Sequence, residues 1–271
     1  MSRAANRIAA RFDALRQTGR KALIPFVTAG DPSLEATVAA MHALVEAGAD
    51  VIELGVAFSD PMADGPTIQR SSERALARGA GLAYVLQTVG AFRRDDATTP
   101  VVLMGYLNPV EIHGTARFAE EAVAAGVDGV LLVDLPPEES AETLAIFTAA
   151  GLDLIVLASP TTSDVRIGLL CDAARGYLYY VSFAGVTGAD HLDTRAAGDR
   201  LRQLGARCAV PVVAGFGIKD ASTAKAMAVD ADGVVVGSAL VAALAEATTL
   251  EAVRERALAF LAPLRQALDQ D

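Results

Sequence analysis

The stretch VIELGVAFSDPMADGPTIQ, residues 51–69, joins a short apolar segment to a loop rich in proline and aspartate. The apolar segment indicates a buried strand, yet it contains the acid Glu53. Burying a charged carboxylate costs free energy, so such a group is usually paired, neutral or functional. In parallel α/β proteins the loops that follow the strands carry binding and catalytic groups. We therefore expect the rest of the chain to position this strand and its loop.

Similar short apolar segments recur along the chain, and a helical pattern follows each of them. The predicted strands are residues 22–28, 51–54, 101–104, 129–133, 154–158, 177–182, 211–214 and 233–236. The predicted helices are residues 2–14, 33–47, 67–78, 83–93, 116–125, 138–149, 164–174, 193–205, 221–229, 240–247 and a last one from 250 onward, where Thr248 and Glu251 have capping-box spacing. Eight strand–helix units in 271 residues favour a closed barrel over an open sheet. We expect one α/β domain over residues 1–271, a (β/α)8 TIM barrel with an extra N-terminal helix and a short extra helix after strand 8.

The composition narrows the class of protein. Hydrophobic residues make up 52% of the chain and charged residues 21%, which predicts a large core and little disorder. The net charge of −10 disfavours a nucleic-acid or anionic membrane surface, although backbone amides could still bind a phosphate. No apolar run is long enough for a membrane span and the N-terminus has no signal core, so we expect a cytoplasmic protein. Cys171 and Cys208 could pair, but we expect two ordinary buried thiols.

Glycines follow the last two predicted strands and precede helical segments, at Gly215, Gly217 and Gly237 with Ser238. Such loops let backbone N–H groups approach an anion at a helix N-terminus, the recurring phosphate site of these barrels. The alternative is that the glycines only form tight turns. The repetition in both loops favours phosphate binding.

Glu53 should point into the barrel, because the two-residue period places it on the same face as Val51. The alternative is a structural ion pair, but the chain has only three lysines and no arginine in a predicted strand. Apolar surroundings would raise the pKa of Glu53 and suit it to acid–base catalysis near neutral pH. On composition alone Asp60, Asp64 and Asp134 are as well explained by turns and caps.

Three absences narrow the chemistry further. The histidines and cysteines have no metal-ligand spacing, so no metal is expected. No lysine lies on a predicted strand, which disfavours a Schiff-base aldolase, and no GxGxxG motif opens the chain. Acid–base chemistry by carboxylates on a phosphorylated substrate remains.

Five segments of the chain, in order, resemble the tryptophan synthase alpha chain family. They are IPFVTAGDPS at 24–33, IELGVAFSDPMADGPTIQ at 52–69, DLPPEE at 134–139, GVTG at 185–188, and GFGI with GSALV at 215–218 and 237–241. The resemblance implies a TIM-barrel lyase that cleaves indole-3-glycerol phosphate to indole and glyceraldehyde 3-phosphate. It also implies an alpha2-beta2 complex with a beta chain, which carries the pyridoxal phosphate, and no cofactor in this chain.

The resemblance also implies roles for residues at matching positions. Glu53 would be the general acid–base and Asp64 would accept the indole N–H. This pairing fits the chemistry, which needs one mobile proton carrier and one carboxylate that stays ionised. The remaining implied contacts are Phe26, Met104, Tyr106, Tyr179, Thr187 and Phe216 for the substrate, and Gly188, Gly217, Gly237 and Ser238 for the phosphate.

The loop at Ala57, Asp60 and Pro61 would face the beta chain. The family usually has proline where Ala57 stands, and alanine there should loosen the loop and weaken signalling between subunits. Two alternatives remain: a non-catalytic barrel whose main role is to activate a beta chain, and a different phosphate-binding barrel enzyme. The intact Glu53, Asp64 and phosphate loops favour the lyase, and an indole-3-glycerol phosphate synthase should place lysines on its strands.

Overall fold

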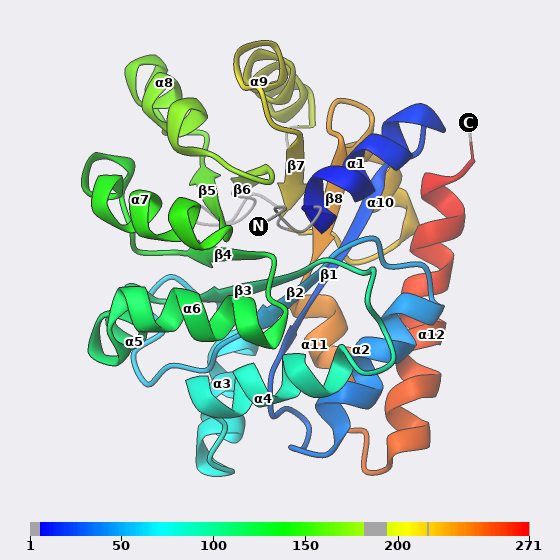
Figure 1. Cartoon of the computed structure of the whole chain (residues 1–271). Helices are drawn as coiled ribbons and strands as arrows, with labels where there is room; N and C mark the ends of the chain where they lie inside the picture. Colours follow the sequence, from blue (N-terminus) through cyan, green and yellow to red (C-terminus); the bar gives the residue numbers. More distant parts are fainter. Residues whose placement is uncertain (1–5, 182–193, 216, 271) are drawn as a thin grey trace.

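Eight parallel strands form a closed barrel in chain order (Figure 1). The computed structural model describes residues 6–181, 194–215 and 217–270. The strands are β1 (Ala22–Thr28), β2 (Ile52–Gly55), β3 (Val101–Gly105), β4 (Gly129–Leu132), β5 (Asp153–Ala158), β6 (Leu178–Val181), β7 (Val212–Gly215) and β8 (Gly233–Val236). Each strand pairs in parallel with the next, and β8 closes on β1. The predicted TIM-barrel fold is confirmed, and every predicted strand lies within a residue or two of an observed one.

Helices surround the barrel, as Figure 1 shows. They are α1 (Arg7–Gln17), α2 (Ala36–Glu46), α3 (Pro66–Ala77), α4 (Leu82–Phe92), α5 (Leu107–His113), α6 (Thr115–Ala125), η1 (Pro137–Glu139), α7 (Ala141–Ala150), α8 (Asp164–Ala173), α9 (Thr194–Arg207), α10 (Ala221–Ala228), α11 (Ser238–Leu244) and α12 (Leu250–Leu268). The extra helix α1 and the short helix α11 after β8 were both predicted. The predicted helix 138–149 is divided between the single turn η1 and α7.

Two local predictions were wrong. No helix was predicted between residues 104 and 116, but α5 begins at Leu107, and Pro109 lies in its first turn, where proline is tolerated. The backbone N–H of Leu107 donates to Asp134 Oδ1 at 2.8 Å, so Asp134 helps to fix the start of this helix. The capping box at Thr248 and Glu251 is not formed, because Thr249 takes the cap position and accepts from the N–H of Ala252 at 3.1 Å.

The core has two layers, one on each face of the sheet. Alternate strand residues such as Ile52 and Leu54 pack outward beneath the helices. The inward layer includes Val51, Val102 and Tyr177, and α1 adds Ile8 and Phe12 to it from one end of the barrel. Since α1 precedes β1 and the site residues follow the strands, this helix closes the end opposite the candidate site.

Aspartates at the starts of strands tie the barrel together at that same end. Asp50 accepts the N–H of Leu23 at 2.9 Å, and Asp128 accepts the N–H of Val101 at 2.8 Å. In each case the carboxylate before one strand binds the start of the preceding strand. These buried carboxylates therefore help to fix the register between neighbouring strands.

Cys171 on α8 and Cys208, directly after α9, form a disulfide with 4.8 Å between their Cα atoms. The expectation of two separate buried thiols is therefore wrong. Residues this far apart in sequence meet only because βα units five and six are neighbours in the barrel. In the part of the chain described, none of the helices has the length and apolar character needed to cross a membrane.

Candidate active site

Glu53 is fully buried inside the barrel, as its two-residue period predicts. Its Oε1 accepts a hydrogen bond from the hydroxyl of Tyr177 at 2.6 Å. Its Oε2 has no hydrogen-bond partner within the described part of the chain. Burial raises the pKa of Glu53 from 4.5 to about 7, and the Tyr177 hydrogen bond opposes that rise. The carboxyl can therefore give and take a proton near neutral pH.

Tyr177 is a site residue that the sequence reading missed. It directly precedes β6, which lies across the closed barrel from β2, and its side chain is fully buried. Its ring lies 5.9 Å from that of Phe12 on α1. The signal was available in the spacing, because the two-residue period that turns Tyr179 inward turns Tyr177 inward as well.

Asp64 lies in the loop between β2 and α3, where it is half-buried. The hydroxyl of Tyr106 donates to Asp64 Oδ2 at 3.0 Å and accepts the backbone N–H of Ala63 at 3.0 Å. One tyrosine therefore holds both the carboxylate and the backbone of this loop. Burial raises the pKa of Asp64, and the hydrogen bond from Tyr106 opposes the rise. Burial thus opposes the ionised form that the predicted role of Asp64 requires, and the Tyr106 hydrogen bond favours that form.

Two adjoining pockets meet at Asp64 and Met104, which line both. The smaller one is also lined by Phe26 and Tyr106. The larger one, of about 300 Å³, is lined further by Leu157 and Tyr179 on β5 and β6 and by Thr162, Arg166 and Leu170 at and within α8. The predicted substrate residues Phe26, Met104, Tyr106 and Tyr179 therefore line two pockets that share Asp64 and Met104.

Glu53 does not line either pocket. It pairs in register with Phe26 on β1, one strand away, and Phe26 lines the smaller pocket. The Glu53 charge also acts on Tyr179, whose pKa is raised well above 10, mainly by burial. The carboxyl thus lies beneath the cavity, turned toward Tyr177.

Glycines leave room for these aromatic rings at two strand ends. A Cβ on Gly55 would lie 2.6 Å from the ring of Phe26, and a Cβ on Gly215 would overlap the hydroxyl of Tyr179. Real Cβ atoms do not approach other atoms so closely, so both positions require glycine. Gly215 had been considered for phosphate binding, and its contact with Tyr179 gives it a packing role.

The predicted phosphate residues lie at the ends of two neighbouring strands. Gly217 follows β7 with φ +77°, a conformation that favours glycine. Gly237 and Ser238 follow β8 and begin α11. These residues share one edge of the barrel because β7 and β8 pair directly. Thr187, Gly188 and Phe216 lie outside the described residues.

In the predicted partner loop, the side chains differ in exposure. Ala57 is buried and packs against Ala75 and Ala80, so its side chain does not face outward. Asp60 is exposed and Pro61 half-buried, and Met62 beside them is 83% exposed. Any contact of Ala57 with a partner is therefore indirect.

Carboxylates dominate the chemistry of this end of the barrel. Among residues 6–181, 194–215 and 217–270, no three or more His, Cys, Asp or Glu side chains are grouped to hold a metal ion. One carboxyl with a pKa near neutrality lies beneath a cavity and a second stands on its rim. That arrangement is suited to proton transfer.

Comparisons with known proteins agree with this reading. The family model described as "Tryptophan synthase alpha chain" matches residues 12–269. The tryptophan synthase alpha chain of Xanthomonas campestris pv. campestris (strain B100) is 77% identical over 270 residues, covering 99% of each chain. That of Xanthomonas axonopodis pv. citri (strain 306) is 78% identical over 265 residues, covering 97% of this chain and 99% of its relative. The crystal structure of tryptophan synthase subunit alpha from Legionella pneumophila str. Paris superposes with a TM-score of 0.91 at 46% identity, covering 98% of this chain and 99% of the other. With the barrel, the two carboxyls and these full-length matches together, the chain belongs to the tryptophan synthase alpha chain family.

Proposed function

We propose that this chain is the lyase that cleaves indole-3-glycerol phosphate to indole and glyceraldehyde 3-phosphate, the alpha reaction of tryptophan biosynthesis. The observation that carries the proposal is Glu53, a fully buried carboxyl with a pKa of about 7 beneath a cavity of suitable size. The alternative of a barrel that only activates a partner is not favoured, because it gives no reason to bury an acid whose Oε2 lacks a partner among the described residues.

The reaction begins with proton transfer to the indole ring. Protonated Glu53 gives its proton to the ring carbon that bears the glycerol chain, which places positive charge on the indole nitrogen. Asp64, at the rim, accepts the indole N–H and stabilises that charge. Tyr106 orients Asp64 through its 3.0 Å hydrogen bond. To reach the ring, the Glu53 carboxyl turns from Tyr177 toward the cavity above it.

Cleavage then regenerates the acid. The Glu53 carboxylate takes the proton of the neighbouring glycerol hydroxyl, whose oxygen becomes the aldehyde carbonyl. The carbon–carbon bond breaks, and its electron pair returns to the ring and restores neutral indole. One residue thus serves as acid and then as base, which requires a pKa close to the working pH. No proton is gained or lost overall.

The substrate's two ends have different surroundings. The apolar and aromatic residues Phe26, Met104 and Tyr179, with Phe216, would hold the indole. Backbone N–H groups at Gly217, Gly237 and Ser238, with Gly188, would hold the phosphate, and Thr187 would cover it. The acidic net charge does not oppose this, because backbone amides bind phosphate without side-chain cations.

The family implies a beta-chain partner, and we propose an alpha2-beta2 complex in the cytoplasm. The loop with exposed Asp60, Pro61 and Met62 is the proposed contact. Carboxylates supply the proton transfers, so we propose that this chain needs no metal or organic cofactor and that pyridoxal phosphate resides on the beta chain.

The test is release of indole from indole-3-glycerol phosphate by the purified chain, with and without a beta chain. Glu53→Gln should lower the rate by about a thousandfold, because general acid–base groups contribute on the order of 10²–10⁴. Glu139→Gln, at an exposed acid in η1, should leave the rate unchanged and serves as the matched control. Normal turnover by Glu53→Gln, with a native circular dichroism spectrum, would show that Glu53 is not the acid or base of the reaction.

A further inference from the structure

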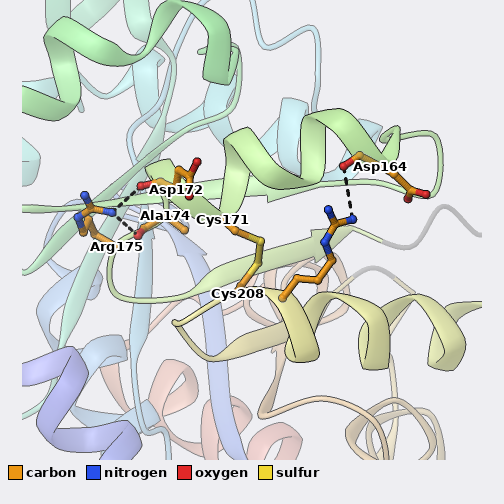
Figure 2. Close-up of a disulfide and its surroundings, with 7 residues drawn as sticks. Asp164, Cys171, Asp172, Ala174, Arg175 and Cys208 are labelled. Carbon is orange, nitrogen blue, oxygen red and sulfur yellow. Dashed lines mark hydrogen bonds between the residues drawn. A yellow bond between two sulfur atoms is a disulfide. The ribbon is translucent and has the colours of Figure 1, made fainter.

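The Cys171–Cys208 disulfide joins two neighbouring helices on the side of the barrel that lines the larger pocket. Figure 2 shows the bond running from α8 to the residue just beyond the end of α9. Both cysteines are half-buried, so solvent reaches the surroundings of the sulfurs. They are also the only two cysteines of the 271-residue chain. No other thiol of the chain can therefore exchange with this bond.

Polar side chains link the start of α8 to α9. Asp164, at the start of α8, accepts from Arg200 at 3.0 Å and from Gln203 at 3.2 Å. The Asp164 side chain is 69% exposed, and exposed ion pairs contribute little to stability. The disulfide holds the opposite end of α8. Breaking it would remove the covalent link between that end of α8 and the residue after α9.

The helix α8 also forms part of a wall of the larger pocket. Arg166 and Leu170 line the cavity together with Asp64 and Tyr179, and Leu170 directly precedes Cys171. The position of α8 therefore sets the width of the pocket on this side. A change at Cys171 acts on the cavity through the adjacent residue.

We propose that Cys171–Cys208 is a redox modification site, at which a dithiol reductant exchanges with the protein disulfide and loosens the α8 wall of the substrate pocket. A cytoplasmic disulfide meets reducing thiols, and bonds of this kind are usually transient or redox-sensing. Neither cysteine residue is fully buried, so a small dithiol can approach the bond. The effect on substrate binding rests on the proposed function, whereas the bond and the helix motion do not.

The exchange balances within the two partners. A thiolate of the reductant attacks one protein sulfur, the Cys171–Cys208 bond breaks, and a mixed disulfide forms. The second thiol of the reductant then displaces the remaining protein sulfur and closes its own disulfide. Two electrons pass to the protein, and two protons end on the sulfurs of Cys171 and Cys208. The disulfide form of the same reagent reverses the reaction.

The experiment compares the full chain in reduced and in oxidised dithiothreitol. Iodoacetamide labelling followed by mass measurement should add two groups after reduction and none after oxidation. Hydrogen exchange of α8 amides should be about tenfold or more faster in the reduced chain, because local opening no longer has to strain a covalent link. Exchange in α2, which lies between β1 and β2 on the far side of the barrel, should not change and serves as the internal reference.

The matched variant is Cys171→Ser with Cys208→Ser. Its α8 amides should exchange at the fast rate in both reagents, which separates loss of the bond from other effects of the reductant. In the native chain, two labelled thiols in both reagents would overturn the proposal. So would an exchange rate of the α8 amides that is the same before and after reduction.

Indole release links the modification to the pocket. The KM for indole-3-glycerol phosphate should rise severalfold on reduction of the native chain and stay constant in the double serine variant. An α8 that responds with an unchanged KM would overturn the coupling to the pocket. If neither redox state releases indole while α8 still responds, the proposed function fails and the redox site stands.

Discussion

Buried acids have different numbers of hydrogen-bond and ion-pair partners at the two ends of the barrel. At the end closed by α1, Asp128 accepts a backbone N–H and contacts two arginines, Arg7 and Arg93, each at 2.8 Å. Glu53, inside the barrel beneath the pocket, has a single phenol as its partner among the described residues. Both carboxyls are almost inaccessible to solvent. The difference lies in what surrounds them.

That difference separates structural acids from a reactive one. The carboxylate of Asp128 has a backbone N–H and two guanidinium groups as partners, and it fixes the start of the preceding strand. A carboxyl with one donor is destabilised as an ion, and its pKa moves toward neutral pH. The molecule thus uses the same functional group for stability at one end and for proton transfer near the other. Four changes test this difference, and they follow in order of decreasing expected effect.

The largest expected effect is loss of stability in Asp128→Ala. Removing the carboxylate leaves Arg93, only 10% exposed, without its ion-pair partner and frees the Val101 N–H. Breaking a buried pair from one side costs about 4 kcal/mol. Urea unfolding should show this loss, while the kcat of the folded fraction stays near the native value. A stable variant with abolished activity would contradict the assignment of Asp128 to structure.

The next effect is the pH dependence of stability caused by Glu53. Its pKa is raised from 4.5 to about 7 in the folded chain, so the folded chain keeps this proton when the unfolded chain has lost it. The contribution of Glu53 is therefore fully present below pH 4.5 and is lost as pH rises through about 7. The loss amounts to about 3 kcal/mol.

Glu53→Gln has no such proton, so its stability relative to the native chain should improve by about 3 kcal/mol between pH 4.5 and pH 8. Urea unfolding of both chains across this range measures the difference. Parallel curves would show that Glu53 titrates normally and would remove the contrast between the two ends.

A smaller effect is expected for Tyr177→Phe. The Tyr177 hydroxyl lowers the pKa of Glu53, so its removal should raise that pKa further. Because the first step needs protonated Glu53, the alkaline limb of kcat/KM should move to higher pH. The lost hydrogen bond should cost about 1 kcal/mol of stability. An unchanged pH profile would show that Tyr177 only fills space.

The smallest effect is expected for Asp232→Ala. Asp232 also accepts the N–H of a neighbouring strand, that of Val212 at 2.8 Å, but it is exposed. Water can replace the lost acceptor, so the cost should be about 1 kcal/mol or less. A shift in melting temperature measures it. A loss as large as that for Asp128→Ala would mean that burial does not decide the cost.

The sequence predicted the features that depend on local patterns. Apolar runs at regular spacing were enough for the barrel, and the two-residue period was enough to turn Glu53 inward. The helix α5 was missed because Leu107-Asn108-Pro109 follows a strand, where proline suggests a loop, although it also suits a first helical turn.

The missed features depend on contacts between distant segments. Tyr177 meets Glu53 only because the barrel closes and brings the start of β6 opposite β2. The pairing of Cys171 with Cys208 requires the ends of two helices to meet. The low exposure of Ala57 follows from Ala75 and Ala80 on and after α3. The two-residue period turns Tyr177 inward, but no periodic pattern says which distant residue it, Cys171 or Ala57 will meet.

The helix α1 packs apolar side chains beneath the reactive acid. Phe12 packs against the ring of Tyr177, whose hydroxyl holds Glu53, and Ile8 lies one turn earlier in the same inward layer. The family match begins at residue 12, inside this helix. A chain trimmed at that boundary would keep every strand and both carboxyls. It would lose Ile8 from the layer beneath Tyr177, and the pKa of Glu53 should fall from about 7 toward 4.5.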